Sequence, residues 1–135
     1  MKIKVAAAFI PDEAGRFLIG CRAQGKLKGL WEFPGGKEEP GETPEQTAVR
    51  EVKEELNLDI VAEKLMGTFS HTYPDRGVTI TIKLIKCRQI DPSQQIVSNG
   101  SHTEFRWVTS KETDGFAFPE VDAQIVEFLK LSKER

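Results

Sequence analysis

The alternation of apolar and polar residues along the chain predicts a domain built largely of short strands. Strands are indicated where residues alternate with a period of two, or where a short apolar run is bounded by turn residues. These runs lie at residues 3–10, 16–22, 31–33, 58–72, 77–88 and 105–108. Turn residues from Pro11 to Gly15 join the first two runs into an expected hairpin, and the third run is expected to stop at the corner 34–36. Polar loops are expected at 23–29 and 89–103.

Two helices are predicted by apolar residues that recur with a helical period. Thr43 is a suitable N-cap, Pro44 suits the first helical position, and Gln46 completes a capping box. Asn57 is expected to end this helix in the left-handed conformation. Its apolar face carries Ala48, Val52 and Leu56, and a second amphipathic helix near the C-terminus carries Ile125, Phe128 and Leu129. Strands mixed with two helices indicate an α/β or α+β fold.

The composition fits one globular domain spanning residues 1–135. The formal net charge of -2 argues against binding to a nucleic acid polymer or a membrane through bulk positive charge. The apolar N-terminal run is too short for a signal peptide, and no apolar stretch is long enough to span a membrane. Cys21 and Cys87 do not have metal-ligand spacing and are expected to be free thiols, which favours a cytoplasmic location.

The candidate chemistry lies on the first helix, in the segment Arg50-Glu51-Val52-Lys53-Glu54-Glu55. At about 100° per residue, Glu51, Glu54 and Glu55 share one arc of the helix surface. Three carboxylates there repel one another unless a cation compensates, and hard cations such as Mg²⁺ take oxygen ligands together with phosphates. The alternative is an ordinary solvated face with an Arg50–Glu54 pair. A glycine-rich corner before the helix, where bare backbone can approach a metal or phosphate, favours the metal site.

This segment resembles the Nudix family signature. The signature has a glycine, a glutamate after five further residues and Arg-Glu after seven more, followed by a short acidic and aliphatic pattern. The matching residues are Gly36, Glu42, Arg50, Glu51, Val52, Glu54, Glu55 and Leu58. Asn57 stands where the family usually has glycine, and asparagine also tolerates the left-handed conformation. Resemblance to the MutT branch of the family extends to Arg22, residues 33–37, residues 41–46 and Pro74-Asp75-Arg76.

The resemblance implies a fold, a cofactor and a mechanism. The implied fold is the Nudix α/β/α sandwich, an α/β fold with a mixed β-sheet between helices. The implied cofactor is Mg²⁺, with Mn²⁺ as the alternative, and its ligands would be the Gly35 carbonyl, Glu51, Glu54 and Glu55. Arg50 would pair with Glu42 or Glu51 and hold the site in register. Water would attack one phosphorus in line, with a glutamate as general base. Glu104 and His102, near the loop 98–103, are candidates for that base, and a helix glutamate such as Glu54 is the alternative.

Candidate substrate contacts follow partly from the resemblance and partly from residue type, and most have an ordinary structural alternative. Arg22 would touch a phosphate, or be a solvated arginine at a strand end. Trp31, Phe33 and Tyr73 are candidates to wall a nucleobase pocket, and the alternative for Trp31 and Phe33 is the core. Asp75 and Arg76 would contact substrate, or only form a turn.

Asp122 is the candidate that would read the base edge, or it is a cap of the last helix. An ionised carboxylate only accepts hydrogen bonds, which favours an amino edge such as cytosine N4 over guanine O6. A carboxyl group kept neutral in an apolar pocket would donate as well as accept. The two states of Asp122 therefore predict different bases.

The leading prediction is an enzyme that hydrolyses (deoxy)nucleoside triphosphates to the monophosphate and pyrophosphate, and so clears oxidised nucleotides such as 8-oxo-dGTP. A cytidine triphosphate pyrophosphohydrolase is the nearest alternative. Hydrolysis of ADP-ribose or of a dinucleotide polyphosphate, and a nucleotide-sensing module without turnover, also stay open. The expected partner is a nucleoside triphosphate, with the protein acting as a monomer or homodimer.

Overall fold

The chain folds into two sheets and two helices in the computed structural model, which describes residues 1–132. The helices are α1 (Pro44–Leu56) and α2 (Glu120–Leu131). The strands are β1 (Lys2–Phe9), β2 (Phe17–Arg22), β3 (Trp31–Glu32), β4 (Gly35–Lys37), β5 (Ile60–Tyr73), β6 (Val78–Gln89) and β7 (His102–Val108). Two 3₁₀ turns are η1 (Pro74–Arg76) and η2 (Glu112–Gly115). None of these helices is long and apolar enough to cross a membrane.

The larger sheet is mixed and the smaller one is antiparallel. The larger sheet has the order β4-β1-β6-β5, in which β1 runs parallel to β6 and the other pairs are antiparallel. The smaller sheet has the order β3-β2-β7. β1 lies near the middle of the larger sheet, so both of its faces need cover.

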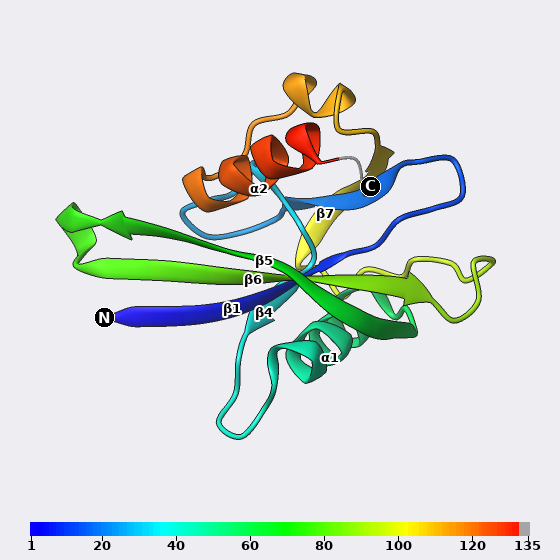
Figure 1. Cartoon of the computed structure of the whole chain (residues 1–135), viewed down its shortest axis with the longest axis horizontal. Coiled ribbons are helices and arrows are strands. Elements are labelled where there is room, and N and C mark those ends of the chain that lie inside the picture. The colour runs from blue at the N-terminus through cyan, green and yellow to red at the C-terminus, as the bar shows by residue number, and fades with distance from the viewer. Residues whose placement is uncertain (133–135) are drawn as a thin grey trace.

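The helices cover opposite faces of the sheet layer, as Figure 1 shows with α2 above the strands and α1 below. Alternate residues along β1 face opposite sides of the sheet, so this strand contributes to the interfaces with both helices. Ala7 and Phe9 pack in the core cluster that includes the apolar face of α2. Ala6, Ala8 and Ile10 pack in the cluster that includes the apolar face of α1. The predicted sandwich of a mixed sheet between helices is therefore confirmed.

α1 begins and ends where local sequence rules place its ends. The Thr43 hydroxyl accepts a hydrogen bond from the Gln46 backbone N–H at 3.1 Å, and the Gln46 side chain accepts one from the Thr43 N–H at 2.9 Å. Asn57 has a φ of 56° and closes the helix in the left-handed region. The helix is thereby fixed at both ends.

The predicted hairpin between the first two strands forms only at its turn. The backbone N–H of Asp12 donates to the carbonyl of Arg16 at 2.8 Å, and that of Leu18 donates to the carbonyl of Ile10 at 3.2 Å. Beyond this point the strands separate, because β1 pairs along its whole length with β6 while β2 pairs with β7. The expected hairpin is wrong for the strands, since these longer pairings satisfy their backbone groups.

The third run stops before the corner 34–36 as expected, since β3 ends at Glu32. The corner nevertheless contains a strand that was not predicted, because residues 35–37 form β4 against β1. The absence of side chains permits this pairing. A Cβ on Gly35 would overlap the carbonyl oxygen of Ala6, so only glycine lets the two backbones approach so closely. β4 therefore places the glycine corner beside α1. The last strand is also longer than predicted, since β7 begins at His102.

Candidate active site

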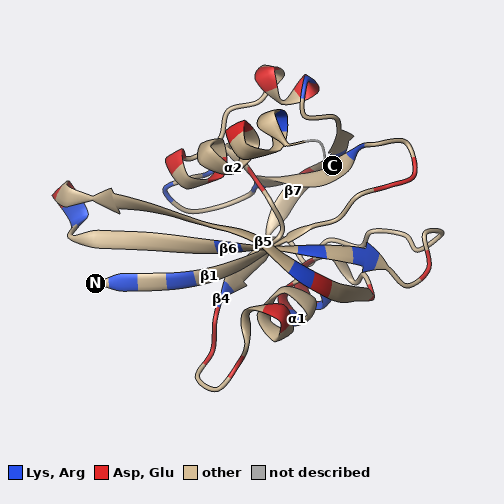
Figure 2. Cartoon of the chain, viewed as in Figure 1, with Lys and Arg blue, Asp and Glu red and all other residues tan. Residues whose placement is uncertain are grey.

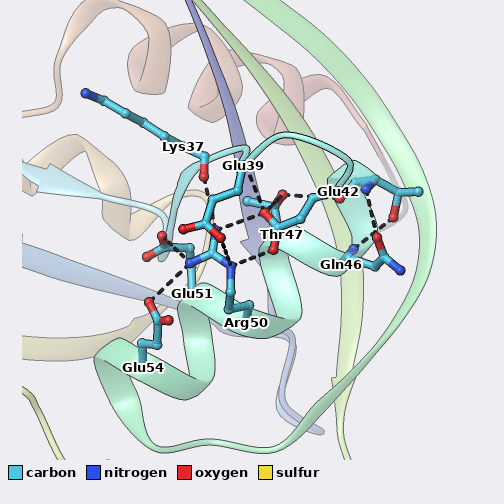
Figure 3. A network of polar contacts seen from close by, with 9 residues as sticks. Lys37, Glu39, Glu42, Gln46, Thr47, Arg50, Glu51 and Glu54 are labelled. Carbon is cyan, nitrogen blue, oxygen red and sulfur yellow. Dashed lines mark hydrogen bonds and ion pairs between the residues drawn. The ribbon is translucent and has the colours of Figure 1, made fainter.

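Arg50 is the centre of a polar network on α1 (Figure 3). Its Nε donates to Glu42 at 2.6 Å and its Nη2 donates to the other Glu42 oxygen at 3.0 Å. Its Nη1 donates to Glu51 at 3.0 Å and to Glu54 at 3.2 Å, and Nη2 also reaches the Lys37 carbonyl at 3.2 Å. Arg50 thus pairs with Glu42 and Glu51 together, where the sequence left one or the other open. The guanidinium ties α1 to β4 and to the connection before α1.

Glu42 is an ionised carboxylate that lies just before α1 and is fixed by several hydrogen bonds. The hydrogen bonds from Arg50 lower its pKa to about 2, with help from the backbone N–H of Glu39 and the Thr47 hydroxyl. Glu39 N and Thr47 Oγ1 lie 3.0 and 2.8 Å from the same Glu42 oxygen. Both carboxylate oxygens therefore have partners, so Glu42 acts in holding the connection before α1 rather than in proton transfer.

Glu51 lies against the bare backbone of β4. A Cβ on Gly36 would overlap the Glu51 carboxyl group, so this approach requires glycine at position 36. Glu54 points outward, with 56% of its side chain exposed, and Arg50 is its only partner among the described contacts. Figure 2 shows acidic residues, in red, on α1 and on the connection that precedes it.

Glu55 is a half-buried member of the carboxylate group. Desolvation, together with the negative charges of Glu51 and Glu32, raises its pKa to about 8 against the lowering effect of the Gly35 backbone N–H. Its Oε1 is buried without a hydrogen-bond partner in the described structure. An unpartnered carboxylate oxygen beside a second carboxylate is an arrangement that a hard cation would stabilise.

The residues therefore fit a divalent cation by their chemistry, although their side chains do not enclose one as they stand. Within residues 1–132, no three acidic, histidine or cysteine side chains converge closely enough to hold a metal ion. The Arg50 guanidinium instead contacts Glu51 and Glu54. Because Glu54 is exposed, it can turn toward Glu51 and Glu55 without disturbing the core.

A cavity of about 220 Å³, here called the inner cavity, lies between the larger sheet and α2. Its wall includes Val5, Ile80, Ile82, Phe33, Tyr73, Val121 and Asp122. Gly35 and Gly36 also line it, and Glu51 packs against Gly36. The inner cavity and the α1 carboxylates thus share one wall, the glycine corner of β4.

Asp122 is the buried polar group of the inner cavity. Burial, together with the charge of Glu32, raises its pKa to about 8 against the lowering effect of hydrogen bonds from the backbone N–H groups of Phe33 and of Asp122 itself. The Phe33 N–H lies 3.3 Å from Oδ2. The N-cap of α2 is Pro119, so Asp122 lies within the first turn and is not the capping residue. The pKa of Asp122 is therefore raised well above its ordinary value, and its side chain lines a cavity, which a simple helix cap would not do.

The predicted aromatic residues have mixed surroundings. Phe33 lines the inner cavity, but its ring stacks with Phe17 at 5.6 Å and Phe118 at 6.4 Å, as a core residue does. Trp31 packs edge-on against Phe116. Tyr73 lines the inner cavity, and its hydroxyl donates to Glu120 at 2.9 Å. Of the three, Tyr73 has the ring least occupied by the core.

Three predicted site residues lie on elements other than α1. Asp75 and Arg76 are in η1, at the tip of the β5–β6 hairpin, where Arg76 sits over the Tyr73 ring at 4.3 Å. Glu104 is exposed on β7 and pairs with Arg106 at 3.1 Å. None of the three lines the inner cavity.

Glu32 is the residue that sequence reasoning missed. One carboxylate oxygen accepts from Arg22 Nη1 at 3.1 Å, and the other lies 2.9 Å from His102 Nε2. Arg22 and Glu32 line the inner cavity and also a second, polar cavity of about 320 Å³, here called the outer cavity. Glu55 lines the outer cavity, together with Gln24 and residues 99–101. A charged residue between two aromatic ones, next to the glycine corner, was the available signal.

The chain is similar to known proteins over most of its length. Residues 6–128 match the sequence profile of the family described as NUDIX domain. An 8-oxo-dGTP diphosphatase from Proteus vulgaris is 40% identical over 85 residues, which cover 62% of this chain and 76% of the relative. A CTP pyrophosphohydrolase from Escherichia coli (strain K12) is 30% identical over 135 residues, with 98% and 96% covered. The solution structure of the E. coli ORF135 protein matches with a TM-score of 0.80 and 29% identity, covering 99% of this chain and 93% of that one.

Proposed function

The chain belongs to the NUDIX family, and from this premise we propose that it hydrolyses nucleoside triphosphates to the monophosphate and pyrophosphate. The observation that carries the proposal is the shared wall between the inner cavity and the α1 carboxylates. A nucleoside held in the inner cavity would extend its phosphates past Gly35 and Gly36 toward Glu51. The names of the two relatives, an 8-oxo-dGTP diphosphatase and a CTP pyrophosphohydrolase, support this reaction.

The carboxylates of α1 would hold the divalent cation, for which Mg²⁺ is proposed and Mn²⁺ is the alternative. Glu51, Glu54, Glu55 and the Gly35 carbonyl are the proposed ligands. When bound there, the cation would polarise a phosphoryl oxygen and lower the pKa of a water molecule. Arg50 holds Glu51 and Glu54 in register from the side of α1. Glu54 is the proposed general base because its side chain is largely exposed, and Glu104 stays the alternative.

We propose 8-oxo-dGTP as the leading substrate because of the protonation state of Asp122. A neutral carboxyl group donates one hydrogen bond and accepts another, so it can satisfy O6 and N7–H of an oxidised guanine together. The raised pKa of Asp122, about 8, supports this state at neutral pH. Cytidine triphosphate is the second candidate, supported by the relative that matches 98% of this chain. It would be favoured if Asp122 ionises when the base binds.

The proposed role is removal of damaged nucleotides from the precursor pool, which would protect DNA. Arg22 is the proposed phosphate contact because it lines both cavities. Cys21 and Cys87 are free thiols, which supports a reducing compartment, and we propose the cytoplasm.

A screen for pyrophosphate release with Mg²⁺ tests the proposed function. Its panel should contain 8-oxo-dGTP, dGTP, CTP, dCTP, ADP-ribose and a dinucleotide polyphosphate. We expect pyrophosphate from the triphosphates, with 8-oxo-dGTP or CTP having the highest kcat/KM. Tight binding without turnover of any compound would instead favour a nucleotide-sensing module.

The Glu55→Gln variant should separate the effect of the metal on stability from its effect on catalysis. Without metal, the variant should be at least as stable as wild type, because it replaces a half-buried carboxyl group next to Glu51 with a neutral amide. With Mg²⁺ the difference should narrow or reverse, because a ligand that binds only the folded state adds stability. Thermal melts with and without Mg²⁺ measure both quantities. An equal response of the two proteins to Mg²⁺ would count against a metal at Glu55.

Asp122 also predicts a pH dependence of folding stability. Its folded pKa, about 8, lies above the unfolded value of 3.8. Its contribution is therefore fully present below pH 3.8 and is lost as the pH rises toward 8, by up to ~1.4 kcal/mol per pH unit. Asp122→Asn cannot titrate, so its free energy of unfolding should fall less between pH 5 and pH 8. Denaturant unfolding at several pH values measures the difference, and parallel pH profiles would contradict the prediction.

A further inference from the structure

His102 is a buried histidine that the proposed reaction does not use. Only 1% of its side chain is exposed, at the start of β7. Its ring lies 5.1 Å from that of Phe105, and a Cβ on Gly20 would come within 2.7 Å of its Cδ2. The imidazole is therefore fixed between β2 and Phe105 and has little freedom to shift.

The polar contact of His102 is directed at the junction of the two cavities. Its Nε2 lies 2.9 Å from Glu32 Oε2, and the other oxygen of Glu32 accepts from Arg22 Nη1 at 3.1 Å. Arg22 and Glu32 line both cavities. A continuous chain of contacts thus runs from the core, through His102 and Glu32, to the guanidinium of Arg22.

The partners of His102 assign its tautomer. Nδ1 is buried and has no hydrogen-bond partner in the described structure, whereas Nε2 faces a carboxylate. A proton on Nε2 gives the carboxylate a donor, and it leaves the lone pair on the side without a partner. His102 therefore acts toward Glu32 as a fixed N–H donor.

We infer that His102 is a positioning residue that holds Glu32 in place, so that Arg22 can exchange this carboxylate for a phosphate of the nucleotide. The inference rests on the proposed function, because it takes a phosphorylated ligand as the second partner of Arg22. It concerns a step of binding, not of bond cleavage. No residue of the α1 carboxylate group takes part in it.

Two features make the exchange favourable. Arg22 Nε is buried without a hydrogen-bond partner in the described structure, so the guanidinium keeps a donor unused. Arginine pairs strongly with phosphate oxygens, which therefore compete with Glu32 for it. When Arg22 turns away, the largely buried Glu32 carboxylate would lose its ion-pair partner, which is costly in proteins. The hydrogen bond from His102 stabilises it, and the carboxylate stays at the cavity wall.

A double-mutant cycle between His102 and Glu32 tests the inference. His102→Leu should raise the KM for the preferred nucleotide roughly five- to thirtyfold with kcat within about threefold, because the binding step loses one charge-assisted hydrogen bond. His102→Gln retains an N–H donor of similar reach and should restore most of the affinity. In a Glu32→Gln background, His102→Leu should change the KM by less than about twofold, because contacting residues with one shared role are not additive.

Two further variants guard against a trivial loss of folding. Gly20→Ala leaves His102 intact but forces its ring to move, so it should raise the KM in the same direction. Thr103→Val changes the exposed neighbour of His102 on β7 and should leave the KM unchanged. If His102→Leu does not fold, His102→Gln and Gly20→Ala complete the test.

The outcomes distinguish this inference from the proposed function. If wild type turns over normally, an unchanged KM in the His102 variants would overturn this inference and leave the proposed function standing. KM effects that multiply with those of Glu32→Gln would have the same meaning. A thermal shift without a change in KM would show that His102 only supports the core. If wild type has no turnover, the same cycle is read in the Kd for an α,β-methylene triphosphate. Failure to bind this analogue would overturn both proposals.

Discussion

Glu54→Gln should lower kcat by about 10³-fold or more while leaving the protein folded. The substitution removes one negative oxygen from the group that would hold the cation and the attacking water, and losses of this size follow the removal of a charge-stabilising or base group. The fold should tolerate it because Glu54 is largely exposed, and Arg50 keeps its bonds to Glu42 and Glu51. Steady-state kinetics with saturating Mg²⁺, together with a thermal melt, measure the two effects separately.

Glu127→Gln is the matched control for this experiment. It makes the same chemical change on α2, where Glu127 is exposed and pairs with Lys130 at 3.7 Å. Its kcat should equal that of wild type. Wild-type turnover by both Glu54→Gln and Glu55→Gln would mean that the reactive centre lies elsewhere in the protein.

Substitution of Asp122 should change which nucleotide is preferred. Asp122→Ala removes the polar group of the inner cavity and leaves a buried base edge without its partner. We expect kcat/KM for the preferred nucleotide to fall about ten- to hundredfold, which corresponds to ~1–3 kcal/mol. Asp122→Asn keeps one donor and one acceptor at every pH, so it should favour bases that present O6, including 8-oxoguanine.

The pH dependence of activity distinguishes the two protonation states of Asp122. Wild type should lose activity toward 8-oxo-dGTP as the pH rises through about 8, because the ionised carboxylate no longer donates. Asp122→Asn should lack this decline. The measurement is kcat/KM for dCTP, dGTP and 8-oxo-dGTP across pH, for wild type and both variants. An unchanged ranking of the three nucleotides in both variants would mean that the base is read elsewhere.

Features determined by local chemistry were predictable from the sequence. The start of α1 at Thr43 and its end at Asn57 depend on residues within a few positions of each other, and the structure confirms both. The α/β/α sandwich was predictable because the family resemblance implies this fold. Glu51, Glu54 and Glu55 could be grouped because helical spacing alone places them in one arc.

Features that depend on residues distant in sequence were not predictable in the same way. The parallel pairing of β1 with β6 joins segments far apart in the chain, and it overrides the hairpin that the turn at Pro11 suggested. β4 escaped prediction because glycines usually interrupt strands, and its pairing depends on the close approach of Ala6. Glu32 and His102 are separated by 70 residues, and only the β3-β2-β7 sheet brings them together.

Burial explains the remaining differences between the residue environments expected from the sequence and those in the structure. Asp122 was an equally good helix cap by its position in the sequence, and its burial against the Phe33 backbone is what distinguishes it. Phe33 was a candidate for stacking on a base, but its ring packs between those of Phe17 and Phe118. Tertiary packing sets both environments, which a pattern of residue types does not specify.

We propose that this fold cleaves a nucleoside triphosphate to the monophosphate and pyrophosphate with the aid of the α1 carboxylates and a divalent cation. The most direct measurement is a ³¹P NMR analysis of the products formed from 8-oxo-dGTP and from CTP, with Mg²⁺ and with excess EDTA. We predict pyrophosphate and the nucleoside monophosphate with Mg²⁺, and no turnover with EDTA or with Glu54→Gln. Release of orthophosphate and a nucleoside diphosphate, or equal turnover in EDTA, would contradict this proposed reaction.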